Sequence, residues 1–121
     1  LNIAAAKSRE HWKSYKELAL IVANVKKANF TDLTDNTEGL HELISNLKQG
    51  IPLVLKSSSI LARIKVLETK LFKLESLVNL DTKTKNLLLI DVISFLESFS
   101  NLNFQINKKL ERDSQNISRP Q

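Results

Sequence analysis

The chain has 121 residues, a formal net charge of +5 at pH 7 and no cysteine, so disulfide bonds and thiolate chemistry are excluded. Its length is that of one domain, and its 42% of hydrophobic residues suffice for a core without a structural metal. It contains only two glycines and two prolines, which favours few, long elements with few tight turns.

The start of the chain and its composition bear on localisation. The sequence begins with Leu1 and contains no methionine, which predicts a preceding N-terminal piece such as a signal peptide or a lipoprotein leader. Its richness in Asn, Lys, Ile, Leu and Ser resembles small helical lipoproteins and periplasmic proteins of bacteria, a resemblance of composition rather than of motif. We expect an extracytoplasmic protein, periplasmic or anchored at the cell surface, with the cytoplasm as the alternative. No stretch predicts a transmembrane segment.

The first predicted helix runs from about Ile3 to Ala28 and is amphipathic. Apolar side chains recur on one side of it at helical spacing. These are Trp12, Tyr15, Leu18, Ile21, Val22 and Val25. The opposite side is charged, which predicts that about half of the circumference is buried.

The segment that follows, residues 29–35, is rich in Asn, Thr and Asp, which favour turns over helix interiors. We expect it to run extended alongside the bundle, with Phe30 and Leu33 as apolar contacts. Asp35 is predicted to cap a short second helix, because Glu38 follows it at capping-box spacing.

Two long helices are predicted over residues 52–79 and 82–113, the second capped by Asp81. The serine run 57–59 is where the third helix is expected to kink or to begin late. Both helices carry apolar residues at alternating spacings of four and three. The first stripe consists of Ile60, Ile64, Leu67, Leu71, Leu74 and Val78, and the second of Leu88, Val92, Phe95, Phe99, Leu102 and Ile106. Because the connection is short, the two helices must be antiparallel neighbours, so the stripes are predicted to pack within one chain.

Charged residues on the third helix suggest an alternative. Arg63 precedes Glu68, and Lys70 precedes Glu75, by five residues, the spacing that pairs charges between the helices of a parallel dimer. These pairs are too few to outweigh the short connection, and we expect a monomer or a weak dimer.

The fold class predicted is all-α, an up-down antiparallel helical bundle of three long helices and one short helix. Residues 1–113 are expected to form this single domain. Residues 114–121 lack apolar periodicity and are expected to form a flexible C-terminal tail.

Motifs for catalysis are absent from the sequence. The two isolated glycines exclude a glycine-rich phosphate loop, and no serine lies in a nucleophile elbow. Glu38 and His41 match the Glu-x-x-His pair of di-iron bundles, but the second copy that such a site needs is missing. Asp91 and Glu97 are expected to face solvent, because buried carboxylates are costly. We predict no enzyme, catalytic residue, cofactor or metal ligand, and keep a bundle-core metalloprotein as a remote alternative.

The positive net charge is the main functional indication, since basic proteins attract nucleic acid, acidic lipid and acidic partners. Most cations are lysines spread over all the helices, which is typical of a solvated surface. We predict a non-catalytic helical interaction or structural module with an unknown protein partner; the alternative is a basic helical binder of polyanions, either nucleic acid or an acidic surface. The candidate partner or anion surface is the outer face of the first helix: Arg9, Lys13, Lys16, Leu20 and Lys27.

Overall fold

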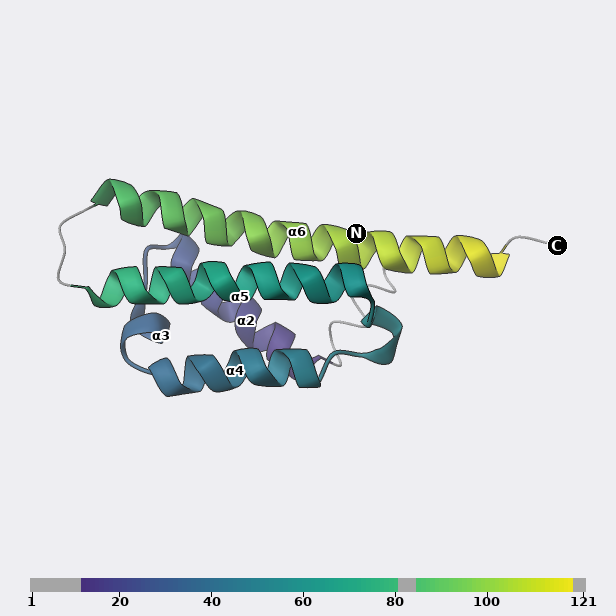
Figure 1. Cartoon of the computed structure of the whole chain (residues 1–121), viewed down its shortest axis with the longest axis horizontal. Helices are drawn as coiled ribbons and strands as arrows, with labels where there is room; N and C mark the ends of the chain where they lie inside the picture. Colours follow the sequence, from purple (N-terminus) through teal and green to yellow (C-terminus); the bar gives the residue numbers. More distant parts are fainter. Residues whose placement is uncertain (1–11, 81–84, 119–121) are drawn as a thin grey trace.

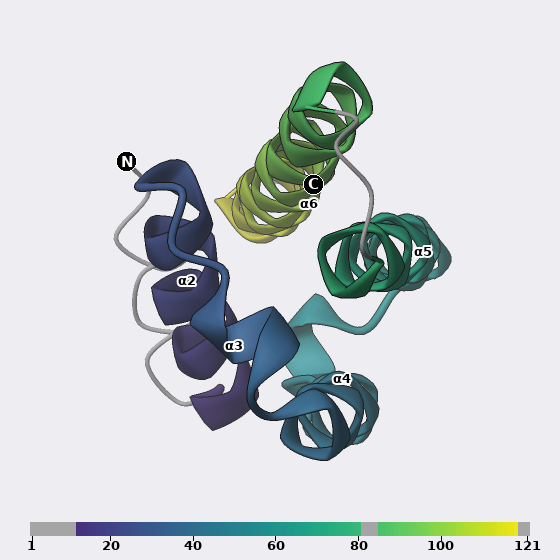
Figure 2. The same cartoon turned by 90° about the vertical axis from the view of Figure 1, so that its left-hand side faces the viewer.

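A computed structural model describes residues 12–80 and 85–118, and it confirms the predicted all-α helical bundle. The elements in chain order are α2 (Lys13–Lys26), α3 (Thr31–Thr34), α4 (Thr37–Gln49), the 3₁₀ turn η1 (Leu53–Leu55), α5 (Ser58–Asn79) and α6 (Lys85–Ser118). Helices α2, α4, α5 and α6 alternate in direction (Figure 1). Seen end-on, α2 and α5 lie diagonally across the bundle, as do α4 and α6, while α3 lies near one end (Figure 2).

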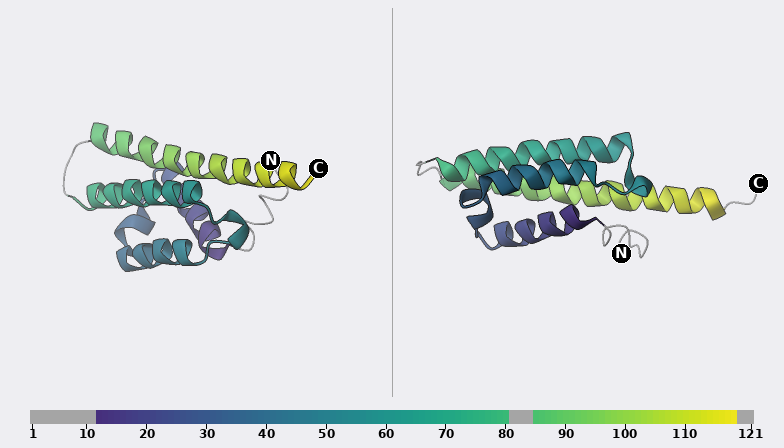
Figure 3. Two further views of the ribbon diagram at one scale, coloured as in Figure 1. Left: turned by 45° about the vertical axis from the view of Figure 1, so that its right-hand side comes forward. Right: turned by 90° about the horizontal axis from the view of Figure 1, so that it is seen from below.

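The helix lengths differ from the prediction of three long helices and one short one. Among the described residues, α5 has 22 residues and α6 has 34, whereas α2 has 14 and α4 has 13. The bundle therefore consists of one long pair and one short pair. The C-terminal part of α6 extends past the other helices (Figures 1 and 3).

The predicted packing of α5 against α6 is confirmed. The two helices lie side by side and antiparallel, and this pair makes the most extensive contact in the bundle (Figure 1). The stripe residues that are fully buried are Ile60, Ile64, Leu67, Leu71, Leu74, Phe95, Leu102 and Ile106. The remaining stripe positions, Val78, Leu88, Val92 and Phe99, pack partly buried against the same core. The stripe on α5 thus has its partner in its own chain.

The third predicted helix begins late, within the serine run. The Ser57 side chain accepts a hydrogen bond from the backbone N–H of Ile60 at 3.2 Å and so caps α5. Before it, the chain passes through η1, in which Leu55 is buried while Leu53 is 88% exposed. The predicted helix over residues 52–79 therefore lacks its first turns, because this stretch leaves the α-helical period as it crosses from α4 to α5.

The first predicted helix begins at Lys13 in the described part of the chain, directly after Trp12. The backbone of Trp12 is not helical (φ −104°, ψ 84°), so α2 begins at Lys13, and residues 1–11 lie outside the described residues. The Trp12 side chain is 1% exposed, and its Nε1–H donates a hydrogen bond to the backbone oxygen of Leu47 at 3.1 Å. Its ring stacks on Tyr15, which stacks on Phe99 of α6 at 5.7 Å between centroids. These aromatic contacts attach α2 to both α4 and α6.

Helix α2 ends two residues earlier than predicted, in a left-handed turn. Ala28 has φ 59°, and its N–H donates to the backbone oxygen of Val25 at 2.9 Å. The N–H of Asn29 donates to the oxygen of Asn24, also at 2.9 Å, which completes a Schellman motif. An alanine therefore occupies the position that usually holds glycine.

The segment between α2 and α4 forms the helical turn α3, so the extended conformation predicted for it is wrong. The Asn29 side chain accepts hydrogen bonds from the N–H and the hydroxyl of Thr31, which starts the turn. The two predicted apolar contacts are present, since Leu33 is fully buried and Phe30 is partly buried against the core. Asn79 of α5 donates a hydrogen bond to the backbone oxygen of Leu33 at 3.0 Å and ties α3 to the long pair.

The cap of α4 is Asn36, one residue after the predicted Asp35. The Asn36 side-chain oxygen accepts a hydrogen bond from the N–H of Gly39 at 3.2 Å. Asp35 instead ends α3 and accepts a hydrogen bond from the hydroxyl of Thr34. A Cβ on Gly39 would lie 2.2 Å from the Asn36 side-chain nitrogen, so glycine allows the capping side chain to fold over the first turn.

Helix α6 continues to Ser118, past the predicted end at Asp113. Lys109 and Asp113 form an ion pair of 2.7 Å one turn apart, just before this extra length. Residues 114–118, predicted to belong to a flexible tail, are helical. The predicted cap Asp81 and residues 119–121 lie outside the described residues.

Replacing either of two fully buried stripe residues should destabilise the bundle strongly. We expect Leu67→Ala and Phe95→Ala each to lower the free energy of unfolding by about 2–5 kcal/mol, because each leaves a cavity between α5 and α6. Leu61→Ala, on the exposed side of α5, is the matched control and should change it by about 0.5 kcal/mol or less. Urea denaturation followed by circular dichroism measures all three, and equal stabilities would contradict the core described here.

Glycine should be better than alanine at the end of α2. We expect Ala28→Gly to raise the free energy of unfolding by about 0.5–1 kcal/mol, since glycine adopts φ 59° without a Cβ penalty. Ala23→Gly, an exposed position inside the same helix, should lower it by up to about 1 kcal/mol. Chemical denaturation tests whether Ala28→Gly raises and Ala23→Gly lowers the free energy of unfolding.

Candidate interaction surface

The outer face of α2 carries four of the five residues singled out in the sequence. Lys13, Lys16 and Lys27 are exposed there, and none of them forms an ion pair with another described residue. Leu20 lies among them and is 68% exposed, an unusual position for a large apolar side chain. The fifth residue, Arg9, lies outside the described residues.

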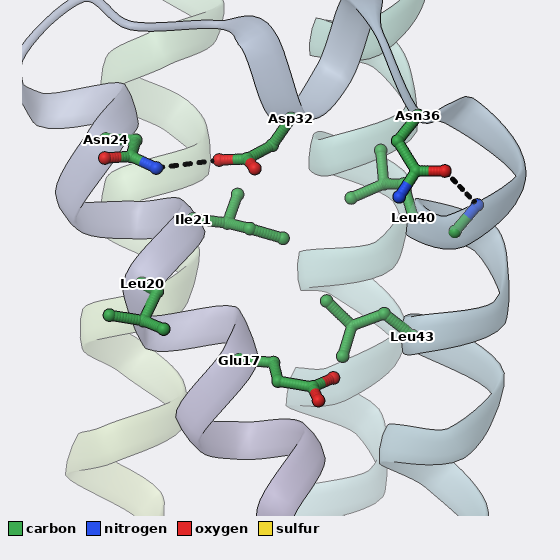
Figure 4. A pocket seen from close by; sticks show the side chains of 9 residues that line it. Glu17, Leu20, Ile21, Asn24, Asp32, Asn36, Leu40 and Leu43 are labelled. Carbon is green, nitrogen blue, oxygen red and sulfur yellow. Dashed lines mark hydrogen bonds between the residues drawn. The ribbon is translucent and has the colours of Figure 1, made fainter.

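A groove runs beside this face, between α2, α3 and α4 (Figure 4). Its volume is about 320 Å³, at the lower end of the range of ligand-binding pockets. Buried apolar side chains form its floor, and polar ones line its edges. The lining residues are Glu17, Leu20, Ile21, Asn24, Asp32, Asn36, Gly39, Leu40 and Leu43.

The edges of the groove carry negative charge. Glu17 is exposed and extends from α2 toward α4, close to Leu43 (Figure 4). Asp32 of α3 accepts a hydrogen bond from the side-chain nitrogen of Asn24 at 2.9 Å, which fixes its carboxylate at the α2 side. Leu20 therefore lies at the edge of this acidic groove, among the exposed lysines of α2.

The sequence predicts a groove beside the short second helix, but not the residues that line it. Glu17 belongs to the charged side of the first predicted helix, which gives no reason to place it at a groove. Asp32 joins it because α3 folds as a helical turn, and no periodicity in the sequence indicates that turn. The short length of the second helix was the one signal, since a short helix beside longer ones leaves part of its neighbours uncovered.

The Glu-x-x-His match has a structural explanation. His41 Nε2 lies 2.9 Å from Oε1 of Glu75 on α5, and the His41 ring stacks on Phe72 at 4.0 Å between centroids. Glu38 is exposed, and it lines a shallow pocket of about 520 Å³ together with His41 and Glu75. Among the described residues, no three histidine, aspartate or glutamate side chains are placed to hold a metal ion. His41 thus joins α4 to α5.

The two glutamates on α5 that had suggested a parallel dimer, Glu68 and Glu75, are paired with α4 of the same chain. Lys48 lies 2.7 Å from a carboxylate oxygen of Glu68, and His41 pairs with Glu75. These contacts hold α4 against α5 at two points about two turns apart. The acidic side chains of the supposed dimer pattern therefore serve the intramolecular contact.

Asp91 is buried, so the prediction that it faces solvent is wrong. It lies on the side of α6 that faces α5, where Lys73 Nζ approaches its carboxylate to 3.6 Å. The lysine supplies the opposite charge that makes this burial tolerable. Glu97 is exposed, as predicted.

No protein-family model, curated protein or solved structure matches this chain. None of the helices in the described ranges is both long and apolar enough to cross a lipid bilayer.

Removing the His41 side chain should destabilise the protein by about 1–3 kcal/mol. Glu75 is buried and its Oε2 already has no hydrogen-bond partner, so His41→Ala leaves the whole carboxylate unsatisfied. Lys48→Ala, which breaks the more exposed pair with Glu68, should cost about 1 kcal/mol or less. Urea denaturation compares the two, and an equal cost would show that the buried carboxylate does not depend on His41.

Proposed function

We propose that the protein is a non-catalytic helical interaction module whose partner binds in the groove between α2 and α4, over Leu20. The observation that carries the proposal is the exposed Leu20 beside a groove with an apolar floor. Exposed apolar residues next to a concave surface are typical of docking sites for side chains of another protein. The lining residues include no nucleophile with a base, which supports binding over catalysis.

The charge at the groove indicates the chemistry of the partner. Glu17 and Asp32 place carboxylates on the edges, while Ile21, Leu40 and Leu43 form the floor. A helix or loop that inserts an apolar side chain between flanking lysines or arginines complements both features. The small volume suits one or two side chains of a protein better than a cofactor.

Localisation belongs to the same proposal. We place this module outside the cytoplasm of a bacterium, as a small lipoprotein-like or periplasmic protein, on the composition of the chain alone.

The alternative function, binding of polyanions, is supported by the exposure of Lys13, Lys16 and Lys27 without ion pairs to described residues. It would use the lysine face of the same helix, which Glu17 borders, since Glu17 lies one turn after Lys13.

A peptide titration tests the proposed groove. We expect a synthetic amphipathic helix of leucine and lysine to shift the amide NMR signals of residues that line the groove, and a leucine–glutamate peptide to leave them unchanged. Leu20→Ser and Glu17→Lys should each weaken binding about tenfold, because each removes one of the two complementary features. Leu61→Ser, an exposed leucine on α5, is the control and should bind normally.

The same titration separates the alternatives. Equal binding of both peptides, or binding that Leu20→Ser leaves unchanged, would refute the groove as the docking site. Binding to heparin that falls steeply with salt and disappears with Lys13→Glu plus Lys16→Glu would support the polyanion-binding alternative.

A further inference from the structure

The outer face of α6 carries a second row of large side chains that no described element covers. Ile90, Ile93 and Phe104 are 60%, 47% and 55% exposed, respectively. Together with the exposed Glu97 and Ser100 they follow spacings of three and four residues, so they form one stripe along the helix. Helix α2 borders this stripe, because its Val22 and Lys26 line a pocket together with Ile93, Glu97 and Ser100.

We propose that this stripe binds the same stripe of a second copy of the chain, with the two α6 helices antiparallel. Ile93 and Phe104 lie equally far from a point midway between Glu97 and Ser100. A two-fold axis at that point therefore places each Ile93 opposite Phe104 of the second copy. It also places each Glu97 opposite Ser100 of the second copy. Such self-complementarity is what an isologous interface requires.

The charges favour the antiparallel arrangement over the parallel one. In a parallel pair each Glu97 would face Glu97 of the second copy, and like charges in the middle of an interface are repulsive. In the antiparallel pair the Ser100 hydroxyl can donate a hydrogen bond to that carboxylate.

Lys26 of α2 supplies the positive charge that complements the Glu97 carboxylate. It extends from α2 into a shallow pocket of about 370 Å³ between α2 and α6, which it shares with Glu97, Ser100 and Ile93. Neither Lys26 nor Glu97 forms an ion pair with another residue in the described part of the chain. Because Lys26 lies beside Ser100, it is placed next to the Glu97 of the second copy. Each half of the interface then contains one cation and one anion from different copies.

The contact is a single pair of helices with a polar centre, which is small for a protein interface. We therefore expect a reversible dimer with a dissociation constant on the order of 10–100 µM. The stripe does not overlap the groove between α2 and α4, so this inference is independent of the proposed function. Dimerisation would leave the groove of each copy accessible, so that one dimer presents two grooves.

Sedimentation velocity between about 5 µM and 1 mM tests the dimer. We expect the average mass to rise from 13.7 kDa toward twice that value. Ile93→Asp should raise the dissociation constant at least about tenfold, because each dimer loses two apolar contacts and gains two buried carboxylates. Leu61→Asp, on the exposed side of α5, should leave it unchanged.

A charge exchange tests the role of Lys26. Lys26→Glu and Glu97→Lys should each weaken the dimer several-fold, and the double variant should restore it, because the opposite charges are re-formed across the interface. Circular dichroism melts confirm that these surface variants remain folded. A double variant that dimerises no better than the single variants would show that Lys26 and Glu97 do not pair across the interface.

Cross-linking tests the orientation, since the chain has no cysteine of its own. On oxidation, a mixture of Ile93→Cys and Phe104→Cys proteins should form covalent dimers. Neither variant should do so alone, since identical positions are about 16 Å apart along antiparallel helices. Cross-linking of each variant with itself would overturn the antiparallel arrangement. A mass that stays at 13.7 kDa up to about 1 mM would overturn the dimer itself.

Discussion

The antiparallel packing of α5 on α6 is the contact on which the rest of the structure depends. Eight stripe residues of the two helices are fully buried in it, each worth roughly 1.5–3 kcal/mol of hydrophobic stabilisation. Once these side chains face each other, the rotation of both helices about their axes is fixed. That rotation directs Glu68 and Glu75 of α5 toward α4, and it turns Ile93 and Phe104 of α6 toward solvent.

The short pair, α2 and α4, packs its buried apolar side chains into the same core and is positioned there by a few specific contacts. Trp12 closes one end by a hydrogen bond to Leu47 and by its stack on Tyr15, which continues to Phe99. At the other end α3 is tied to α5 by Asn79. The groove lined by Leu20 lies between these two short helices, next to α3.

Charge is distributed over the molecule in a way that net charge alone does not reveal. The positive charge of the chain dominates the outer face of α2, yet the adjacent groove is edged by Glu17 and Asp32. A partner that touches both surfaces must therefore present both signs of charge. This combination favours recognition of a particular protein over general attraction to a polyanion.

The sequence by itself determined the fold class, the stripe that pairs α5 with α6, and the exposure of Lys13, Lys16, Leu20 and Lys27. These follow from helical periodicity, which is a property of neighbouring residues. The tertiary structure alone decided that Asp91 and Glu75 are buried. The environment of a carboxylate depends on what lies across from it, and their partners, Lys73 and His41, are distant in the chain. The same holds for the groove, whose acidic edges come from two helices that only the packing of the bundle brings together.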